Sequence, residues 1–128
     1  MIDINTTTEW AYQHLAGKTV FNADIGKNIV FTKQGLKHAI RSKPNPVKIA
    51  LTYAVKDLLP DAKLIKIESD KKDRPDIKRV LTLYNSWKYE SVVYGVYLVI
   101  REGNNGHVYY DHFAIKKIAS ADTTPRPR

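Results

Sequence analysis

Two β-forming segments near the end of the chain constrain its fold most. Residues 91–101 and 107–116 are rich in β-branched and aromatic residues, which favour strands. Between them lies the sequence EGNNG, and Asn-Asn or Asn-Gly at the centre of such a segment is typical of a tight hairpin turn. The sequence therefore predicts a long antiparallel β-hairpin.

The segments before this hairpin are mostly helical. Residues 8–17 predict a helix with Thr8 as N-cap, and residues 33–41 predict a second helix after Thr32. A third helix begins at Pro46 and has one apolar stripe, formed by Val47, Ala50, Leu51, Ala54, Val55 and Leu58.

The remaining segments are short. Residues 19–21, 28–32 and 62–68 predict extended structure, and the charged residues 69–75 predict an exposed loop. Residues 77–87 fit a helix and a bent strand equally well. Helices followed by an antiparallel sheet indicate an α+β fold. At 128 residues the chain has the length of one domain, which we expect at 1–118 with a tail at 119–128.

Positive charge is concentrated in one part of the chain. The net charge is +8, and no acidic residue occurs between Asp24 and Asp57. That stretch carries Lys27, Lys33, Lys37, Arg41, Lys43, Lys48 and Lys56. The pattern favours a polyanionic partner over the alternative of an ordinary solvated surface.

Several kinds of chemistry lack support in the sequence. Cysteine is absent, which excludes disulfides, thiol nucleophiles and thiolate metal sites. Metal-binding, phosphate-loop, dinucleotide and serine-hydrolase motifs are also missing, so we expect no metal and no cofactor. We see no signal peptide and no apolar run long enough to span a membrane.

The predicted hairpin places candidate functional residues together. A two-residue loop at Asn104-Asn105 or at Asn105-Gly106 puts the same side chains on one sheet face. A three-residue loop would instead turn the side chains of one strand to the opposite face. The shared face holds Tyr97, Arg101, Tyr110, His112 and Lys116. The opposite face is apolar and is expected to cover the helix after Pro46. The polar face is either an ordinary solvated sheet surface or a site for a phosphodiester.

His38 lies on the exposed side of the helix over 33–41. It is about 200° around the helix from the apolar Leu36 and Ile40, and it lies near Lys37 and Arg41. Taken alone, this position favours simple solvent exposure. Histidine, arginine, lysine and tyrosine on a basic scaffold nevertheless suit metal-free RNA cleavage, in which the 2′-hydroxyl of the substrate is the nucleophile.

Three segments resemble a known superfamily. Residues 31–38 (FTKQGLKH), 97–102 (YLVIRE) and 106–112 (GHVYYDH) are similar to motifs of the barnase–EndoU–colicin–RelE-like nucleases. The most similar members are nuclease-like domains of polyvalent proteins from phages and mobile elements, and of bacterial polymorphic toxins. The resemblance implies helices packed on a four-stranded antiparallel sheet and metal-independent ribonuclease activity. It carries over functional positions to Lys37, His38, Arg101, Tyr110 and His112.

These expectations define roles and partners. His38 or His112 is the general base and the other the general acid, Arg101 and Lys37 hold the phosphate, and Tyr110 contacts the phosphate or a base. Arg41, Tyr97 and Lys116 are further substrate-binding candidates. The resemblance implies that the domain acts on RNA, tRNA included, in the bacterial cytoplasm and has an acidic immunity protein as partner. The alternatives are a non-catalytic RNA- or DNA-binding module and a domain that binds only a protein partner.

Overall fold

The computed structural model describes residues 3–70 and 74–120, and in these residues the chain forms four helices and six strands. The helices are α1 (Ile4–His14), α2 (Lys33–Arg41), α3 (Pro46–Thr52) and α4 (Val55–Leu58). The strands are β1 (Thr19–Asn22), β2 (Lys27–Val30), β3 (Lys63–Glu68), β4 (Ile77–Tyr89), β5 (Val92–Gly103) and β6 (Val108–Ser120). The broad α+β class is as predicted.

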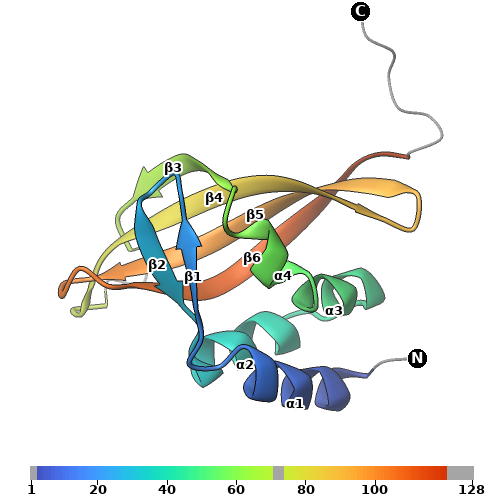
Figure 1. The fold of residues 1–128 in the computed structure, drawn as a ribbon, viewed down its shortest axis with the longest axis horizontal. Helices are drawn as coiled ribbons and strands as arrows, with labels where there is room; N and C mark the ends of the chain where they lie inside the picture. Colours follow the sequence, from blue (N-terminus) through green and yellow to red (C-terminus); the bar gives the residue numbers. More distant parts are fainter. Residues whose placement is uncertain (1–2, 71–73, 121–128) are drawn as a thin grey trace, which may run out of the picture.

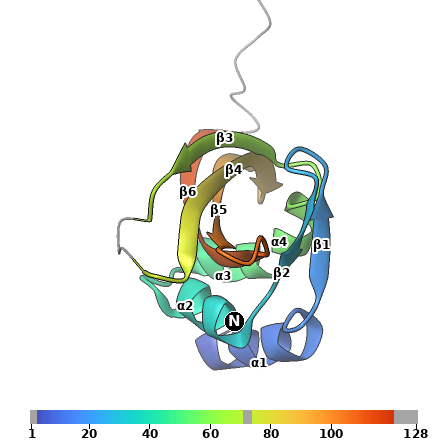
Figure 2. The same cartoon turned by 90° about the vertical axis from the view of Figure 1, so that its left-hand side faces the viewer.

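The predicted four-stranded antiparallel sheet is wrong. The six strands of the described chain form one sheet in the order β1-β2-β6-β5-β4-β3. The first two strands form a hairpin of their own, and β2 then pairs with β6 in parallel. This hairpin therefore extends the sheet beyond β6 and makes it mixed. Figure 2 shows that the sheet is strongly curled.

One face of the sheet forms the core. Leu81, Leu83 and Leu98 are buried there, and Leu83 lies directly opposite Leu98. Leu15, which follows the last residue of α1, is buried in the same cluster, together with Leu36 and Ile40 from α2. Helices α1, α2 and α3 lie close together on one side of the sheet (Figure 1). The other sheet face carries His112 together with Val99 and Tyr97.

Local structure departs from the sequence prediction at several elements. Residues 77–87, which fitted a helix or a strand, belong to β4. The single helix predicted after Pro46 is divided at Tyr53, where the backbone N–H groups of Tyr53 and Ala54 donate to carbonyls three residues earlier, at 3.1 and 2.8 Å. Strand β6 includes Ala119 and Ser120, the first residues of the predicted tail, and the rest of that tail lies outside the described residues.

The first helix begins earlier than predicted. The Asp3 carboxylate accepts a hydrogen bond from the Thr6 backbone N–H at 2.6 Å, so Asp3 is the N-cap of α1. Thr8 instead lies inside the helix, where its hydroxyl donates to the Ile4 carbonyl at 2.7 Å.

Candidate functional site

Helix α2 lies along the edge of β6. Strand β2 pairs with β6 only at Val108 and Tyr109, and the chain then turns into α2. A side chain at Gly35 would collide with the Tyr110 carbonyl oxygen, so the glycine permits this close approach. Thr32 is the N-cap of α2, since the Gly35 N–H donates to its hydroxyl at 3.0 Å. This packing brings the exposed side of α2 next to β6.

A bulge in β6 determines which side chains face α2. Tyr110 pairs with Ile100 and His112 pairs with Val99, so Asp111 is an extra residue between them. Such a bulge twists a strand and redirects its side chains. His112 thereby shares a sheet face with Val99 and Arg101, as predicted, while the Asp111 carboxylate lies beside it.

Two histidines from distant parts of the chain meet at this edge. The ring centroids of His38 and His112 are 5.8 Å apart, and the rings are nearly perpendicular, at 82°. The Nδ1 atom of His112 lies 3.1 Å from Oδ2 of Asp111. Because an ionised carboxylate can only accept a hydrogen bond, Nδ1 carries the proton in this contact. The Nε2 atom of His112 is then left for a substrate.

The Asp111 carboxylate lies among positive groups. Its Oδ1 atom is 3.7 Å from Nε of Arg101, and its side chain is only 15% exposed. Burial raises the pKa of Asp111, but the hydrogen bond from His112 and the charges of His112, Arg101 and Arg74 outweigh burial and hold the pKa below its usual value. Asp111 is therefore ionised at neutral pH and able to orient His112.

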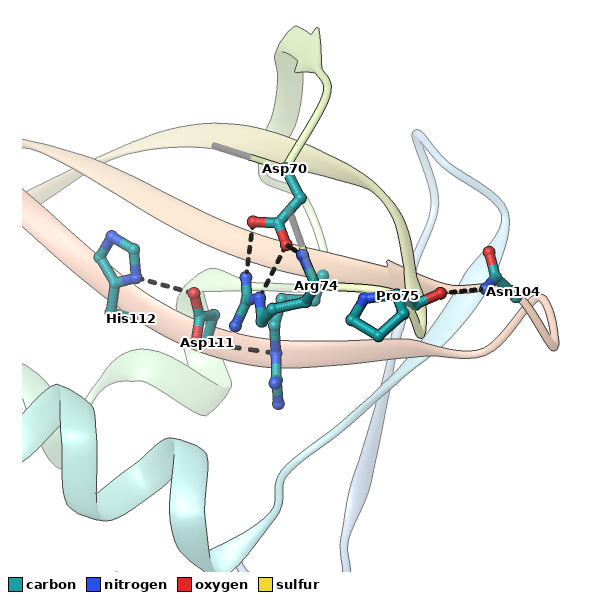
Figure 3. Close-up of polar contacts among 7 residues, drawn as sticks. Asp70, Arg74, Pro75, Asn104, Asp111 and His112 are labelled. Carbon is teal, nitrogen blue, oxygen red and sulfur yellow. Dashed lines mark hydrogen bonds and ion pairs between the residues drawn. The ribbon is translucent and has the colours of Figure 1, made fainter. Parts of the chain in front are cut away.

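Arg74 brings a second guanidinium to the site. It lies in the loop between β3 and β4, and Figure 3 shows it between Asp70 and Asp111. Its Nε and Nη2 atoms donate to the Asp70 carboxylate at 2.8 and 3.0 Å. The hydrogen bond with Asp70 raises the pKa of Arg74 above its usual value, although burial opposes the shift. The pair fixes the guanidinium close to Asp111.

Two hollows adjoin these residues. One, of about 130 Å³, is lined in part by His38, Arg74, Arg101 and Asp111. The other, of about 230 Å³, is lined in part by His112 and again by Arg74 and Asp111. Nε of Arg101 is buried and has no hydrogen-bond acceptor among the described residues. We call these two hollows, with the residues just named, the histidine site.

The other predicted residues lie at different distances from the histidine site. Lys37 and Arg41 line a shallow hollow together with His38, and Arg41 also donates to the Asn5 side chain at 3.0 Å. Tyr97 and Lys116 share the sheet face of His112 but lie further along it, opposite Ala114 and Gly95.

The placement of Tyr110 on the polar face is wrong. Its ring is buried in the core, where it packs against Phe31 at 5.3 Å. Burial raises the pKa of its hydroxyl well above the usual value, and the charge of Asp111 adds to this effect. The hydroxyl has no hydrogen-bond partner among the described residues. Tyr109 takes the place on the face of Arg101, which lies directly opposite it.

Sequence reasoning missed Asp111, Arg74 and Asp70. Simple strand alternation puts Asp111 on the sheet face opposite to Tyr110 and His112, and the bulge that changes this alternation leaves no clear sequence signal. Arg74 and Asp70 looked like ordinary charges of an exposed loop. Across residues 3–70 and 74–120, no cluster of three or more histidine, aspartate or glutamate side chains is arranged to hold a metal ion. No helix of these residues is long and apolar enough to cross a membrane.

Comparison with known proteins adds one finding. No curated protein and no solved structure matches the chain. The family model described as large polyvalent protein-associated domain 3 matches residues 5–110, which include α2, the hairpin turn and Arg101. This match confirms the predicted association with polyvalent proteins, whereas the nuclease superfamily stays a prediction. The chain belongs to the large polyvalent protein-associated domain 3 family.

Proposed function

We propose that the histidine site cleaves RNA without a metal ion. The observation that carries the proposal is the pairing of His38 with His112, whose ring centroids are 5.8 Å apart beside Arg101. Cleavage of RNA by its own 2′-hydroxyl needs one group that removes a proton and one that returns a proton. Two imidazoles that reach the same phosphate meet this need near neutral pH.

The reaction proceeds in one displacement at phosphorus. One histidine removes the proton of the 2′-hydroxyl, and the 2′-oxygen forms a bond to phosphorus while the bond to the 5′-oxygen breaks. The other histidine donates a proton to that leaving oxygen. The products are a 2′,3′-cyclic phosphate and a free 5′-hydroxyl. Either histidine can take either role in this scheme.

Positive groups around Asp111 support the reaction electrostatically. The Arg101 side chain is 20% exposed and lines the hollow beside His38, so the exposed part of its guanidinium can donate to a phosphate oxygen there. Gln34 at the start of α2 lines the same hollow, and the positive end of a helix dipole favours an anion there. Lys37 and Arg41, which line a hollow with His38, extend the positive surface for the rest of the RNA.

The resemblance to barnase–EndoU–colicin–RelE-like nucleases supports the same activity. It suggests a toxin-like ribonuclease from a phage or mobile element, with cellular RNA as substrate and an acidic immunity protein as partner. The family match to polyvalent proteins agrees with such an origin.

The test is cleavage of total cellular RNA and purified tRNA in the presence of EDTA. We expect fragments that end in 2′,3′-cyclic phosphates from the wild type. We expect a loss of about 10²–10⁴-fold in rate from His38→Ala and from His112→Ala, the size that one positioned proton-transfer group contributes.

The matched control is His107→Ala, because His107 is an exposed histidine at the start of the same strand region. This variant should cleave RNA at the wild-type rate. RNA that binds but stays intact would refute the nuclease and favour a nucleic-acid-binding module. Equal cleavage rates for the wild type and the three histidine variants would show that the cleavage does not depend on the histidine site.

A further inference from the structure

A separate hollow lies where the first three helices come together (Figure 1). It has a volume of about 500 Å³, within the size range of ligand pockets. The start of α1, the end of α2 and the loop that leads into α3 form its lining, and neither His38 nor His112 belongs to it. The apolar part of the lining consists of Ile4, Pro44, Pro46 and Ile49.

The apolar wall of this hollow is accessible and stiff. Pro44 and Pro46 are exposed, and Ile4 and Ile49 are half-buried. Each proline ring fixes its own backbone, so the loop loses little conformational freedom when a ligand binds. None of the described lining residues is aromatic, so the wall offers no ring on which a nucleobase could stack. An aliphatic side chain therefore suits this wall better than a base does.

The polar rim of the hollow offers hydrogen-bond donors. The side-chain oxygen of Asn5 accepts from Nη2 of Arg41 at 3.0 Å. The side-chain oxygen of Asn45 accepts from the Lys48 backbone N–H at 3.0 Å, as the N-cap of α3. Since both amide oxygens are engaged, each amide presents its nitrogen as a donor, and Arg41 has further N–H groups. These groups fit a ligand that only accepts hydrogen bonds, as a carboxylate does.

Charge around the hollow also favours an acidic ligand. Arg41 and Lys48 belong to residues 25–56, which contain no acidic residue. Nζ of Lys48 donates to the carbonyl of the C-cap residue of α2, which holds this cation to the same loop. Asp3 is the acidic residue of the described lining, and its carboxylate caps α1 by accepting from the Thr6 N–H at 2.6 Å. The net positive charge at the rim therefore attracts an anion.

We propose that this hollow binds an acidic segment of a partner protein, in which a carboxylate side chain stands next to an aliphatic one. The carboxylate accepts from Arg41 and from the amide nitrogens of Asn5 and Asn45, and the aliphatic side chain packs on the isoleucine–proline wall. Arg41 also lines the shallow hollow that contains Lys37 and His38, so the bound segment competes with RNA for Arg41. This competition rests on the proposed function, whereas binding of the segment does not.

The test is titration of the isotope-labelled protein with blocked tripeptides, followed by NMR. The probe is acetyl-Glu-Leu-Glu-amide. One control peptide, acetyl-Gln-Leu-Gln-amide, lacks the charges, and the other, acetyl-Glu-Ser-Glu-amide, lacks the aliphatic side chain. We expect saturable shifts at the backbone N–H groups of Asn5, Arg41 and Ile49. Either control peptide should bind at least about tenfold more weakly, the size expected for one charge-assisted hydrogen bond or one buried aliphatic side chain.

Variants of the hollow test each contact. Arg41→Gln should remove the preference for the charged peptide, and Ile49→Ala should remove the preference for leucine over serine. Lys56→Gln, on α4, removes one positive charge of the same acid-free stretch and should bind all three peptides as the wild type does. The comparison of the three peptides on the wild type needs no variant, so it decides the proposal even if a substitution prevents folding.

The outcomes separate this proposal from the proposed function. Equal affinities for the charged and uncharged peptides, no binding of any peptide, shifts outside the hollow, or equal losses from Arg41→Gln and Lys56→Gln would each overturn the peptide site. RNA cleavage by the same protein would then leave the ribonuclease standing. Conversely, binding of the charged peptide in this hollow by a protein that leaves RNA intact would support the peptide site and refute the nuclease.

Discussion

Among single residues, Asp111 has the clearest consequence for function. Its carboxylate accepts from Nδ1 of His112 at 3.1 Å and lies 3.7 Å from Arg101, so it fixes both the tautomer and the orientation of His112. Asp111→Asn removes the charge while keeping the shape. We expect a loss of about 10²-fold or more in RNA cleavage, because a wrongly oriented or wrongly protonated imidazole transfers protons poorly.

Cleavage rate and RNA affinity should separate in this variant. The substitution removes a negative charge from a site that binds an anion, so the affinity for an uncleavable RNA should stay the same or rise. The matched control is Asp57→Asn, which makes the same aspartate-to-asparagine change on α4, far from His112 along the chain. A cleavage rate equal to that of the wild type would refute the orienting role of Asp111.

At the scale of elements, the hairpin shows what sequence patterns can and cannot predict. Both strands and the position of the turn were predicted. The Gly103 N–H, however, donates to the His107 carbonyl at 2.9 Å across a three-residue loop that ends at Gly106, with φ +84°. Relative to a two-residue loop, this loop moves the side chains of the second strand to the opposite sheet face, and the bulge at Asp111 moves those after it back. His112 therefore lies as predicted and Tyr110 does not.

Other elements follow the same division between local and tertiary signals. The bounds of α2 and its exposed side were predicted, because helix boundaries and helical periodicity depend on local sequence. The meeting of His38 with His112 depends on how α2 packs against β6, which no local pattern encodes. The parallel pairing of β2 with β6 is missed for the same reason, since it joins segments far apart in the chain.

The contact between α2 and β6 makes a prediction about Gly35. In an ordinary helix interior, replacing glycine by alanine stabilises by about 1 kcal/mol. Here the added methyl group would collide with the Tyr110 carbonyl oxygen. We expect Gly35→Ala to destabilise by about 1–3 kcal/mol, as overpacking does, measured by urea unfolding. A Gly35→Ala variant more stable than the wild type would show that α2 is not packed closely on β6.

The pairing of β4 with β5 predicts a pH dependence of stability. The side chain of Glu102 is 4% exposed, and Oε1 lies 2.8 Å from Nε of Arg79. Burial raises the pKa of Glu102, but the hydrogen bond and charge of Arg79 outweigh it, so the pKa lies below its usual 4.5. Because the pKa of Glu102 is lower in the folded than in the unfolded chain, the ionised side chain stabilises the fold at pH values above its unfolded-state pKa. This stabilisation is lost as the pH falls through its folded-state pKa.

Glu102→Gln should therefore lower the melting temperature most at neutral pH. The difference from the wild type should shrink as the pH falls below the ordinary glutamate value, because the wild type loses its ion pair by protonation. Glu9→Gln, a change of an exposed residue on α1, should show no such trend. A constant difference at all pH values would contradict the role given to this pair.

At the scale of the whole molecule, the net charge of +8 matters through its position. Lys37 and Arg41 lie on α2 and line a hollow with His38. Lys56 comes from the same acid-free stretch but lies on α4, and Lys63 begins β3 at the far edge of the sheet. If RNA crosses the histidine site, the α2 pair neutralises phosphates and the distant pair does not.

Salt dependence distinguishes these two pairs. The logarithm of RNA affinity falls with the logarithm of salt concentration, with a slope of about −0.7 for each phosphate that a single strand has neutralised. Measured on an RNA that lacks the 2′-hydroxyl at the cleaved position, Lys37→Ala with Arg41→Ala should reduce the slope by about 1.4. Lys56→Ala with Lys63→Ala removes the same charge and should leave the slope unchanged. An equal reduction by both pairs would mean that RNA is attracted by net charge alone, and that α2 does not guide it to His38 and His112.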